Sequence, residues 1–296
     1  MTVPVRDKFK LMEPTIRSVL SQTYSPMDIV FSDQGSTDDS LRMLLYYAER
    51  YEGPNKVYVL QCPETEPKGM VGFNTHLNWL HNTLSYDLNI CVSADDINAV
   101  TRAEETVKAY KEHAADYYLT GMLFQSPEGQ VNGRNAEPGK SGYVSTKEHL
   151  TGLIGGSTSQ AWTSDFWSKW GPIEGCSIID LAMPYFAACD KGLYYLHDLL
   201  FAYVEHADPN NTGLGGQRRA ADGMERAQVE EKAGYQLVST LYWMMRKAET
   251  MQKNGFVWKE EDQQALHDDV ILRSHQWAIA RDTITAGRIP PLPLRA

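Results

Sequence analysis

Short apolar runs alternate with helical patterns along the first half of the chain. The runs are three to nine residues long, and apolar side chains recur at helical spacing between them. The predicted strands are 3–5, 28–32, 56–61, 88–92 and 116–124, and the predicted helices are 13–22, one through 41–45, 73–84 and 101–113. Strands that alternate with helices are typical of an α/β fold with a mostly parallel central sheet flanked by helices.

The pattern changes after the last of these strands. Residues 125–141 are rich in Gly, Asn and Pro, which predicts an exposed loop or hairpin, and 180–189 has helical spacing. Beyond residue 216 the apolar positions follow long helical patterns at 236–251 and 261–285. We therefore expect one α/β domain over 1–215 and a C-terminal helical extension over 216–296, with a Pro-rich tail that cannot be helical.

The extension carries several large apolar side chains. These are Trp243, Met244, Met245 and Trp258. Packing on the first domain is the default interpretation of such apolar stripes. A homodimer surface and an approach to a membrane are the alternatives.

Composition excludes some classes of protein. The chain has 296 residues with 42% hydrophobic residues, enough for a sizeable core, and its formal net charge of -10 leaves no broad basic surface for nucleic acid. The four cysteines show no C-x-x-C spacing, which favours reduced structural thiols. No signal peptide and no run of about eighteen apolar residues is evident, so the sequence predicts a soluble cytoplasmic protein without a transmembrane segment.

Two adjacent acids follow directly on the apolar run 88–92. Carboxylates at the carboxyl end of a strand point into the crevice where open α/β sheets bind ligands, and two of them together repel unless a cation or hydrogen bonds offset the charge. Asp95 and Asp96 therefore indicate a site for Mg²⁺ or Mn²⁺. The alternative is that the pair opens the next helix, one acid as N-cap and the other favoured by the helix dipole.

Three stretches in order along the chain resemble family 2 glycosyltransferases of the GT-A fold. They are Ser18-Val-Leu-Ser-Gln-Thr-Tyr24, Asp28-Ile-Val-Phe-Ser-Asp-Gln-Gly-Ser-Thr-Asp-Asp-Ser40 and Ser93-Ala-Asp-Asp96. The resemblance covers roughly residues 1–215. It implies a GT-A fold with a donor half over about 1–124 and an acceptor half over about 125–215, a nucleoside-diphosphate sugar as donor substrate, and Mn²⁺ or Mg²⁺ as cofactor.

The resemblance also implies where the nucleotide binds. The end of the first strand and the turn after the second would hold the base, through Pro4, Val5, Arg6, Asp33 and Gln34. The chain departs from the family pattern here, because the usual tyrosine of the first strand is missing and Gln34 replaces an acid. Glutamine both donates and accepts hydrogen bonds, so its side chain is compatible with uracil and also with other bases. For Asp33 and Gln34 the alternative is an ordinary turn without a binding role. Members of the family often carry a donor-binding arginine near residues 69–78, and Lys68 is the expected substitute for it here.

The implied metal site follows from the same resemblance. Asp96 matches the family's metal-binding acid, and Asp95 matches an acid near the ribose and the metal. His206 follows the closing strand of the family and would complete the metal site or bind the diphosphate. The metal would bridge the two phosphates and stabilise the charge of the leaving group.

The run 171–180 resembles the family's acceptor-side segment. It implies that Asp180 is the catalytic base that takes the proton from the acceptor hydroxyl. Glu174 competes for this role, and an N-cap function is the alternative for Asp180. Near this segment in the sequence stand Trp162, Trp167 and Trp170, for which a core position and stacking on a sugar face are the alternatives.

The sequence thus predicts a metal-dependent, inverting glycosyltransferase. A saccharide or glycoconjugate is the favoured acceptor, and a hydroxylated DNA base, as used by viral relatives, is the alternative that the acidic charge disfavours. A degenerate nucleotide-binding protein and a metal-dependent nucleotidyltransferase are the other classes. A nucleotidyltransferase ordinarily has a glycine-rich phosphate loop after the first strand, and residues 6–8 contain no glycine.

Overall fold

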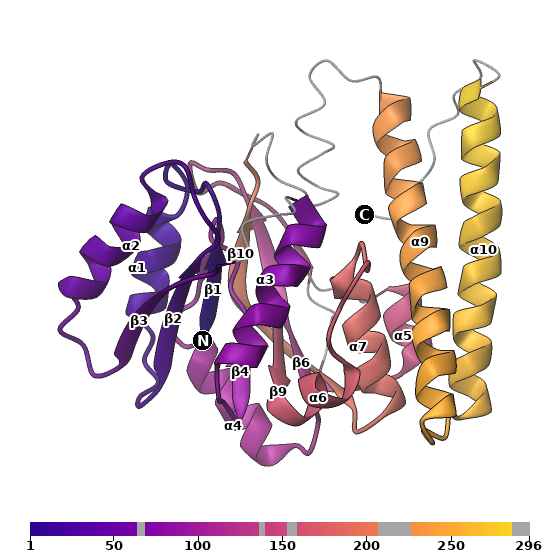
Figure 1. Cartoon of the computed structure of the whole chain (residues 1–296), viewed down its shortest axis with the longest axis horizontal. Coiled ribbons are helices and arrows are strands. Elements are labelled where there is room, and N and C mark those ends of the chain that lie inside the picture. The colour runs from indigo at the N-terminus through magenta and orange to yellow at the C-terminus, as the bar shows by residue number, and fades with distance from the viewer. Residues whose placement is uncertain (64–68, 136–139, 153–158, 207–225, 286–296) are drawn as a thin grey trace.

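A parallel sheet forms the first part of the molecule. The computed structural model describes residues 1–63, 69–135, 140–152, 159–206 and 226–285. In it β1 (Thr2–Val5), β2 (Asp28–Asp33) and β3 (Lys56–Gln61) are parallel and lie in the order β1-β2-β3. Helices α1 (Glu13–Leu20) and α2 (Ser40–Glu49) pack beside these strands (Figure 1). Apolar side chains from both layers form one core cluster, as the alternation of strands and helices predicts.

A seven-stranded mixed sheet continues the fold. Its path is β4 (Leu88–Ile90), β9 (Gln160–Thr163), β6 (Tyr117–Gln125), β10 (Leu193–Val204) and β5 (Ile97–Asn98). Strands β6 and β10 are parallel, whereas β9 lies antiparallel between β4 and β6. Two further strands pair at the sides, β7 (Val131–Asn135) with β6 and β8 (Gly142–Val144) with β10.

Backbone contacts between β1 and the residues after β4 join the two sheets. Thr2 forms a parallel bridge with Cys91, and the Val92 N–H donates to the Thr2 carbonyl at 3.0 Å. The Thr2 hydroxyl also donates to Asn89 Oδ1 at 2.9 Å. The chain therefore runs parallel to β1 as it approaches the acid pair, and the carboxyl ends of both segments meet at one edge of the sheet, where α/β folds bind ligands.

The second core cluster lies between this sheet and the helices α3 (Gly69–Thr83), α6 (Ser164–Trp170) and α7 (Ile179–Cys189). The three tryptophans Trp162, Trp167 and Trp170 are 1%, 8% and 0% exposed and belong to this core. Stacking on a sugar face is therefore the wrong interpretation for them. Helices α4 (Arg102–Glu112) and α5 (Thr146–Thr151) complete the domain, and the cysteines Cys62, Cys91, Cys176 and Cys189 are buried free thiols.

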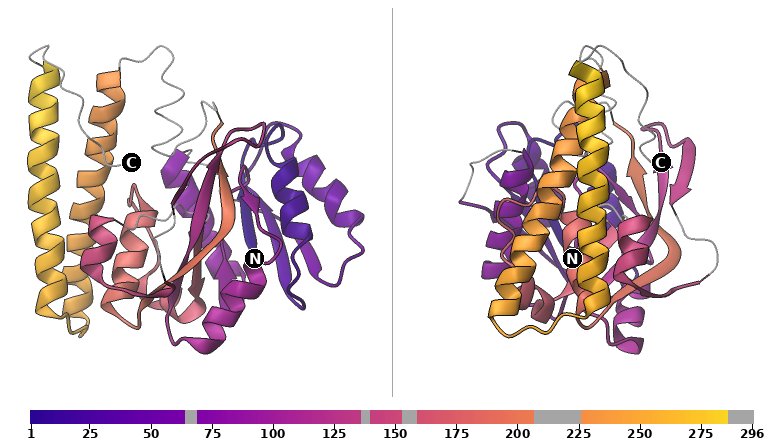
Figure 2. Two further views of the ribbon diagram at one scale, coloured as in Figure 1. Left: turned by 180° about the vertical axis from the view of Figure 1, so that it is seen from behind. Right: turned by 90° about the vertical axis from the view of Figure 1, so that its right-hand side faces the viewer.

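The C-terminal extension is a pair of long helices, α9 (Arg226–Lys253) and α10 (Glu260–Thr285), which stand side by side next to α5 and α7 (Figures 1 and 2). Trp243, Met244 and Trp258 are buried in the same core cluster as α6 and α7. The expected packing on the first domain is thus confirmed. No helix among the described residues is long and apolar enough to cross a membrane, and the Pro-rich tail lies outside them.

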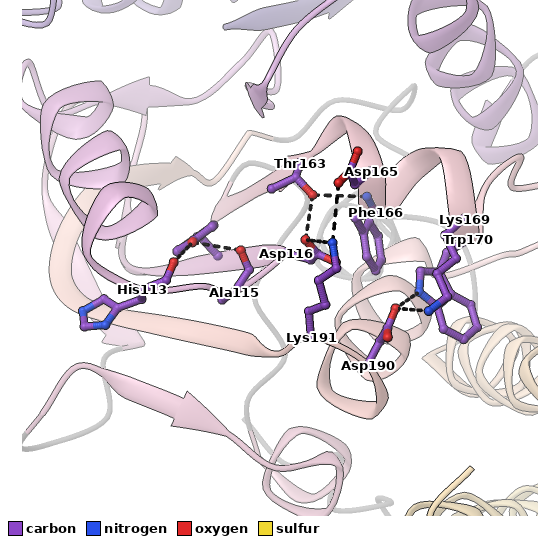
Figure 3. A network of polar contacts seen from close by, with 11 residues as sticks. His113, Ala115, Asp116, Thr163, Asp165, Phe166, Lys169, Trp170, Asp190 and Lys191 are labelled. Carbon is purple, nitrogen blue, oxygen red and sulfur yellow. Dashed lines mark hydrogen bonds and ion pairs between the residues drawn. The ribbon is translucent and has the colours of Figure 1, made fainter. Parts of the chain in front are cut away.

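A polar network fixes the edge of the sheet opposite to the acid pair, at the amino ends of β6 and β10 (Figure 3). Asp116 accepts a hydrogen bond from the Thr163 hydroxyl at 3.0 Å, and Thr163 in turn caps α6 by accepting from the Phe166 N–H. Lys191 Nζ lies 3.6 Å from Asp116 and 3.5 Å from Asp165. These contacts join the ends of β9, α6 and α7, so we interpret them as part of the scaffold.

Candidate active site

The loops after β1 and β2 are interlocked by hydrogen bonds. Asp7 has a left-handed backbone conformation with φ of 51°. Its carboxylate accepts from the Thr37 N–H at 2.6 Å, and its own N–H donates to Ser36 Oγ at 2.9 Å. The Lys8 N–H donates to Ser40 Oγ at 2.9 Å. A left-handed aspartate is costly, so the surrounding contacts hold this edge of the sheet in one shape.

Asp33 and Gln34 lie at the end of β2 within this double loop, each 3% exposed. Asp33 Oδ2 accepts from the Ser36 N–H at 3.1 Å, whereas the buried Asp33 Oδ1 has no hydrogen-bond donor among the described residues. A buried carboxylate oxygen without a donor is unfavourable, which makes this atom a candidate partner for a ligand. Gln34 Nε2 donates to the Gly72 carbonyl at 2.9 Å, so it ties the loop to α3.

The other residues expected at the nucleotide differ in their surroundings. Pro4 and Val5 are buried in β1, and Val5 packs in the core of the parallel sheet. The Val5 carbonyl accepts from the Gln34 N–H at 2.9 Å, which joins the end of β1 to the turn after β2. Lys68 lies outside the described residues.

His76, which no sequence motif singled out, lies near Arg6 of the expected nucleotide site. His76 on α3 is 2% exposed, and its Nε2 lies 2.7 Å from the Ser32 hydroxyl. Burial lowers the pKa of His76 to about 4, and the Arg6 guanidinium nearby contributes to the same shift. The imidazole is therefore neutral at pH 7, and Arg6 supplies the positive charge beside β2.

The acid pair meets the end of β10. Asp95 Oδ2 forms a 2.7 Å ion pair with Lys8 Nζ, and the Asp95 carbonyl lies 3.0 Å from His206 Nε2. Asp96 is 2% exposed, and its Oδ1 accepts from the Val204 N–H at 3.0 Å. The structure thus brings Asp95, Asp96 and His206 together. Lys8, which no motif singled out, is a further residue of the site.

A buried arginine lies beneath the acid pair. Arg102 is 0% exposed, and its guanidinium donates to Asn98 Oδ1 at 2.5 Å and to the Cys91 carbonyl at 3.0 Å. Burial lowers the pKa of Arg102 to about 10, and the negative charge of Asp96 opposes this shift. The arginine therefore joins both ends of the segment that carries the acids. It offsets part of their charge.

Asp180 lies in the first turn of α7. Its Oδ1 accepts from Gln160 Nε2 at 3.0 Å, and Gln160 Oε1 accepts from the hydroxyl of the fully buried Tyr117. The pKa of the Cys91 thiol rises to about 12, chiefly through burial and also through the charge of Asp180. Asp180 thus lies near the chain that leads from β4 to the acid pair. The competitor Glu174 is exposed on the preceding segment.

Side chains of α3 hold the segment before Asp180. Asn78 forms two reciprocal hydrogen bonds with the backbone of Ile173, at 3.1 Å through Nδ2 and at 3.0 Å through Oδ1. Asn74 Nδ2 donates to the Cys176 carbonyl at 2.6 Å. Residues that lie far apart in the sequence are thereby fixed against each other. Helix α3 therefore supports the segment before Asp180 directly.

Asp96 and His206 are the described side chains that the sequence assigns to a metal. No group of three His, Cys, Asp or Glu side chains in the described ranges is arranged to hold a metal ion. The chemistry of Asp96 and His206 nevertheless fits Mn²⁺ or Mg²⁺, because carboxylate oxygens are hard ligands and imidazole suits manganese. Both lie at the same strand end.

The chain is similar to known proteins in sequence and in fold. The model of the family described as "Glycosyl transferase family 2" matches residues 2–168. No curated protein matches the chain. The structure is similar to that of S. aureus TarS 1-349 in complex with UDP-GlcNAc, with 13% identity and a TM-score of 0.59 over 97% of this chain and 91% of that chain.

A second solved structure is similar over most of the chain as well. It is the mannosyltransferase PcManGT from Pyrobaculum calidifontis in complex with GDP-Man and Mn2+, with 14% identity and a TM-score of 0.61 over 98% of this chain and 75% of that chain. Identities this low carry information on the fold alone. The expected GT-A fold is confirmed, including the helices that follow the α/β domain.

Proposed function

Because the chain belongs to glycosyl transferase family 2 and is a glycosyl-transferring enzyme, we propose that it is a metal-dependent, inverting glycosyltransferase. It moves a sugar from a nucleoside-diphosphate sugar to an acceptor hydroxyl. The observation that carries the proposal is the junction of the acid pair with the end of β10, where Asp96 accepts from the Val204 N–H and His206 meets the Asp95 carbonyl. A carboxylate and an imidazole at one strand end are suitable ligands for Mn²⁺.

The donor would bind at the carboxyl edge of the first sheet. Asp33 Oδ1, buried and without a donor among the described residues, accepts an N–H of the base in this proposal. Arg6 and Lys8 supply positive charge toward the nucleotide. Asp96 and His206 would hold the metal, which when bound neutralises the charge that develops on the diphosphate.

Asp180 serves as the general base. Its carboxylate takes the proton of the acceptor hydroxyl while the acceptor oxygen bonds to the anomeric carbon and the bond from that carbon to the diphosphate breaks. Gln160 donates to one carboxylate oxygen and is itself held by Tyr117, so the base is oriented before the acceptor arrives. One carboxylate is sufficient, because the nucleotide is the leaving group.

The acceptor in this proposal is a saccharide or glycoconjugate. The formal net charge of -10 disfavours a nucleic acid, because a DNA-binding surface needs lysines and arginines to replace counterions. A hydroxylated DNA base is therefore an outcome to test for and not the expected acceptor.

The first experiment is calorimetric titration of UDP, GDP, CDP and ADP with and without Mn²⁺. We expect one of them to bind and Mn²⁺ to tighten its binding. Asp96→Asn keeps an acceptor for the Val204 N–H, and we expect it to weaken binding in Mn²⁺ roughly hundredfold, about 2.7 kcal/mol. Release of nucleotide from UDP-GlcNAc and GDP-Man, with and without added saccharides, then tests transfer. Failure of every nucleotide to bind would favour a degenerate protein of this family.

A further inference from the structure

The segment Gly171–Ile178 connects α6 to α7 without helix or strand and leads directly to Asp180. An irregular segment has few backbone partners of its own, so side chains must bond its N–H and C=O groups. On one side these are the asparagines of α3. On the other side they come from α9 of the C-terminal extension, which stands beside α7 in two views (Figures 1 and 2).

Three side chains of α9 bond the backbone of this segment. Thr240 Oγ1 accepts from the Ile178 N–H at 3.0 Å, Trp243 Nε1 donates to the Glu174 carbonyl at 2.7 Å, and Lys247 Nζ donates to the Gly171 carbonyl at 3.3 Å. Positions three and four apart share one face of a helix. One face of α9 is thus fitted with polar groups that match the segment along its length.

Thr240 of α9 contacts the residue that directly precedes α7. Ile178 is the N-cap residue of α7 and supplies no side-chain hydrogen bond, since its side chain is apolar. Thr240 is 0% exposed, and its hydroxyl also donates to the Gln236 carbonyl at 2.8 Å, which fixes its orientation. A side chain from α9 therefore satisfies a backbone N–H at the start of α7, two residues before Asp180.

We propose that α9 is a positioning element for the catalytic carboxylate, with Thr240 and Trp243 as the positioning residues that fix Gly171–Ile178 and so the start of α7. The inference rests on the proposed role of Asp180. It assigns part of the active-site framework to residues beyond the family match, which ends at residue 168. The extension then takes part in transfer without touching the substrates.

Simple core packing is the competing explanation of α9. Leu241 and Met244 are 0% exposed, and Trp243 packs on Phe186 with ring centroids 6.1 Å apart. Packing alone predicts that altering the polar groups changes stability without changing turnover. Positioning predicts a lower kcat at temperatures where the variant is fully folded, because small displacements of a catalytic group are costly in rate.

The test compares Thr240→Val, which has nearly the same shape without the hydroxyl, with Thr240→Ser, which keeps it. Nucleotide release from the donor reports transfer to water or to an added saccharide. We expect Thr240→Val to lower kcat roughly tenfold to hundredfold, with the donor KM unchanged, and Thr240→Ser to restore most of the rate. Trp243→Phe, which keeps an aromatic side chain but loses the N–H and part of the indole, should act in the same direction. Tyr242→Phe, at a 51% exposed position of the same helix, is the control.

Two results would overturn the inference. One is a kcat of Thr240→Val equal to that of the unaltered protein, with or without a lower melting temperature. The other is an equal loss in Thr240→Val and Tyr242→Phe. If the unaltered protein releases no nucleotide from any donor, the proposed function fails first. Hydrogen exchange then decides on α9, since the amides of 173–178 must exchange faster in Thr240→Val than in Tyr242→Phe.

Discussion

The proposed nucleotide side and the proposed acceptor side of this site are built in different ways. Asp33 and the acid pair lie where β2 and the chain after β4 end, so regular strands bring them to one edge of the sheet. Asp180 follows an irregular segment, and its position depends on side chains of α3 and α9 that bond the backbone of that segment. Strand ends place groups through the sheet, whereas the acceptor side depends on individual side chains.

This difference predicts how each side responds to mutation. A polar group on the nucleotide side can be altered while the sheet keeps its neighbours in place. On the acceptor side, a single lost hydrogen bond leaves a backbone group of the segment without a partner and allows the segment to move. The two sides should therefore separate in experiments that measure nucleotide binding and turnover independently.

The largest expected effect is that of Asp180→Asn. Removal of a general base should lower the rate of transfer by roughly a hundredfold to ten-thousandfold, whereas nucleotide affinity in Mn²⁺ should stay within about twofold, because Asp180 lies on the acceptor side. Nucleotide release and calorimetry measure the two quantities.

Asp33→Asn should show the reverse, a weaker nucleotide complex with most of the turnover at saturation retained.

Glu174→Gln is the matched control for Asp180→Asn, since Glu174 is an exposed acid of the same segment. Its rate should equal that of the unaltered chain. Full activity of Asp180→Asn would eliminate Asp180 as the base, and a loss in Glu174→Gln would transfer the role to Glu174.

Acid should weaken the packing of α3 against β9 and α6. His81 on α3 stacks on Trp167 with ring centroids 3.8 Å apart, and its Nε2 accepts from Trp162 Nε1 at 3.1 Å. Because the indole can only donate, the neutral ring carries its proton on Nδ1, toward the Tyr86 hydroxyl. Burial lowers the pKa of His81 from 6.5 to about 3. A second proton would have to bind Nε2, where it would point at the N–H of the Trp162 indole.

Proton linkage gives the direction in which stability changes with pH. Between pH 6.5 and about pH 4 the unfolded chain binds a proton at His81 that the folded chain excludes, so stability is full above pH 6.5 and falls as the pH falls. The expected loss is roughly 3 kcal/mol by pH 4. Denaturant unfolding at several pH values should show it, and His81→Gln should flatten the dependence. His267→Gln, at an exposed position, should leave the slope unchanged. An equal slope in His81→Gln would contradict the assignment.

The strand ends that carry Asp33 and the acid pair could be predicted from the sequence for a physical reason. Period-two and helical patterns predict strands and helices, and a parallel sheet then collects its carboxyl ends at one edge. The strands at 28–33 and 56–61, and the meeting of Asp95 and Asp96 with His206, follow from this rule together with the family resemblance. The short elements at 142–151 and 160–170 were not predicted, because they are too brief to show a period.

The supporting polar residues could not be predicted in the same way. Arg102 and His76 are 0% and 2% exposed, although a charged or polar residue on a helix ordinarily indicates the exposed face. Asn78 and Thr240 bond to a segment that lies 95 and 62 positions away from them in the sequence, respectively. No local pattern encodes such pairings, because each depends on how separate helices pack.

The smallest expected effect tests the support from α3. Asn78→Ala removes both hydrogen bonds to Ile173, whose side chain is 0% exposed, and leaves its backbone N–H and carbonyl without these partners. The expected loss is about 1–3 kcal/mol in the free energy of unfolding. Asn82→Ala, on the exposed face of the same helix, is the matched control, and it should be neutral or slightly stabilising, since alanine is the better helix former. Denaturant unfolding compares them. Equal stability of the two variants would show that Asn78 does not support the segment, and the acceptor side would then depend on Asn74 and α9 alone.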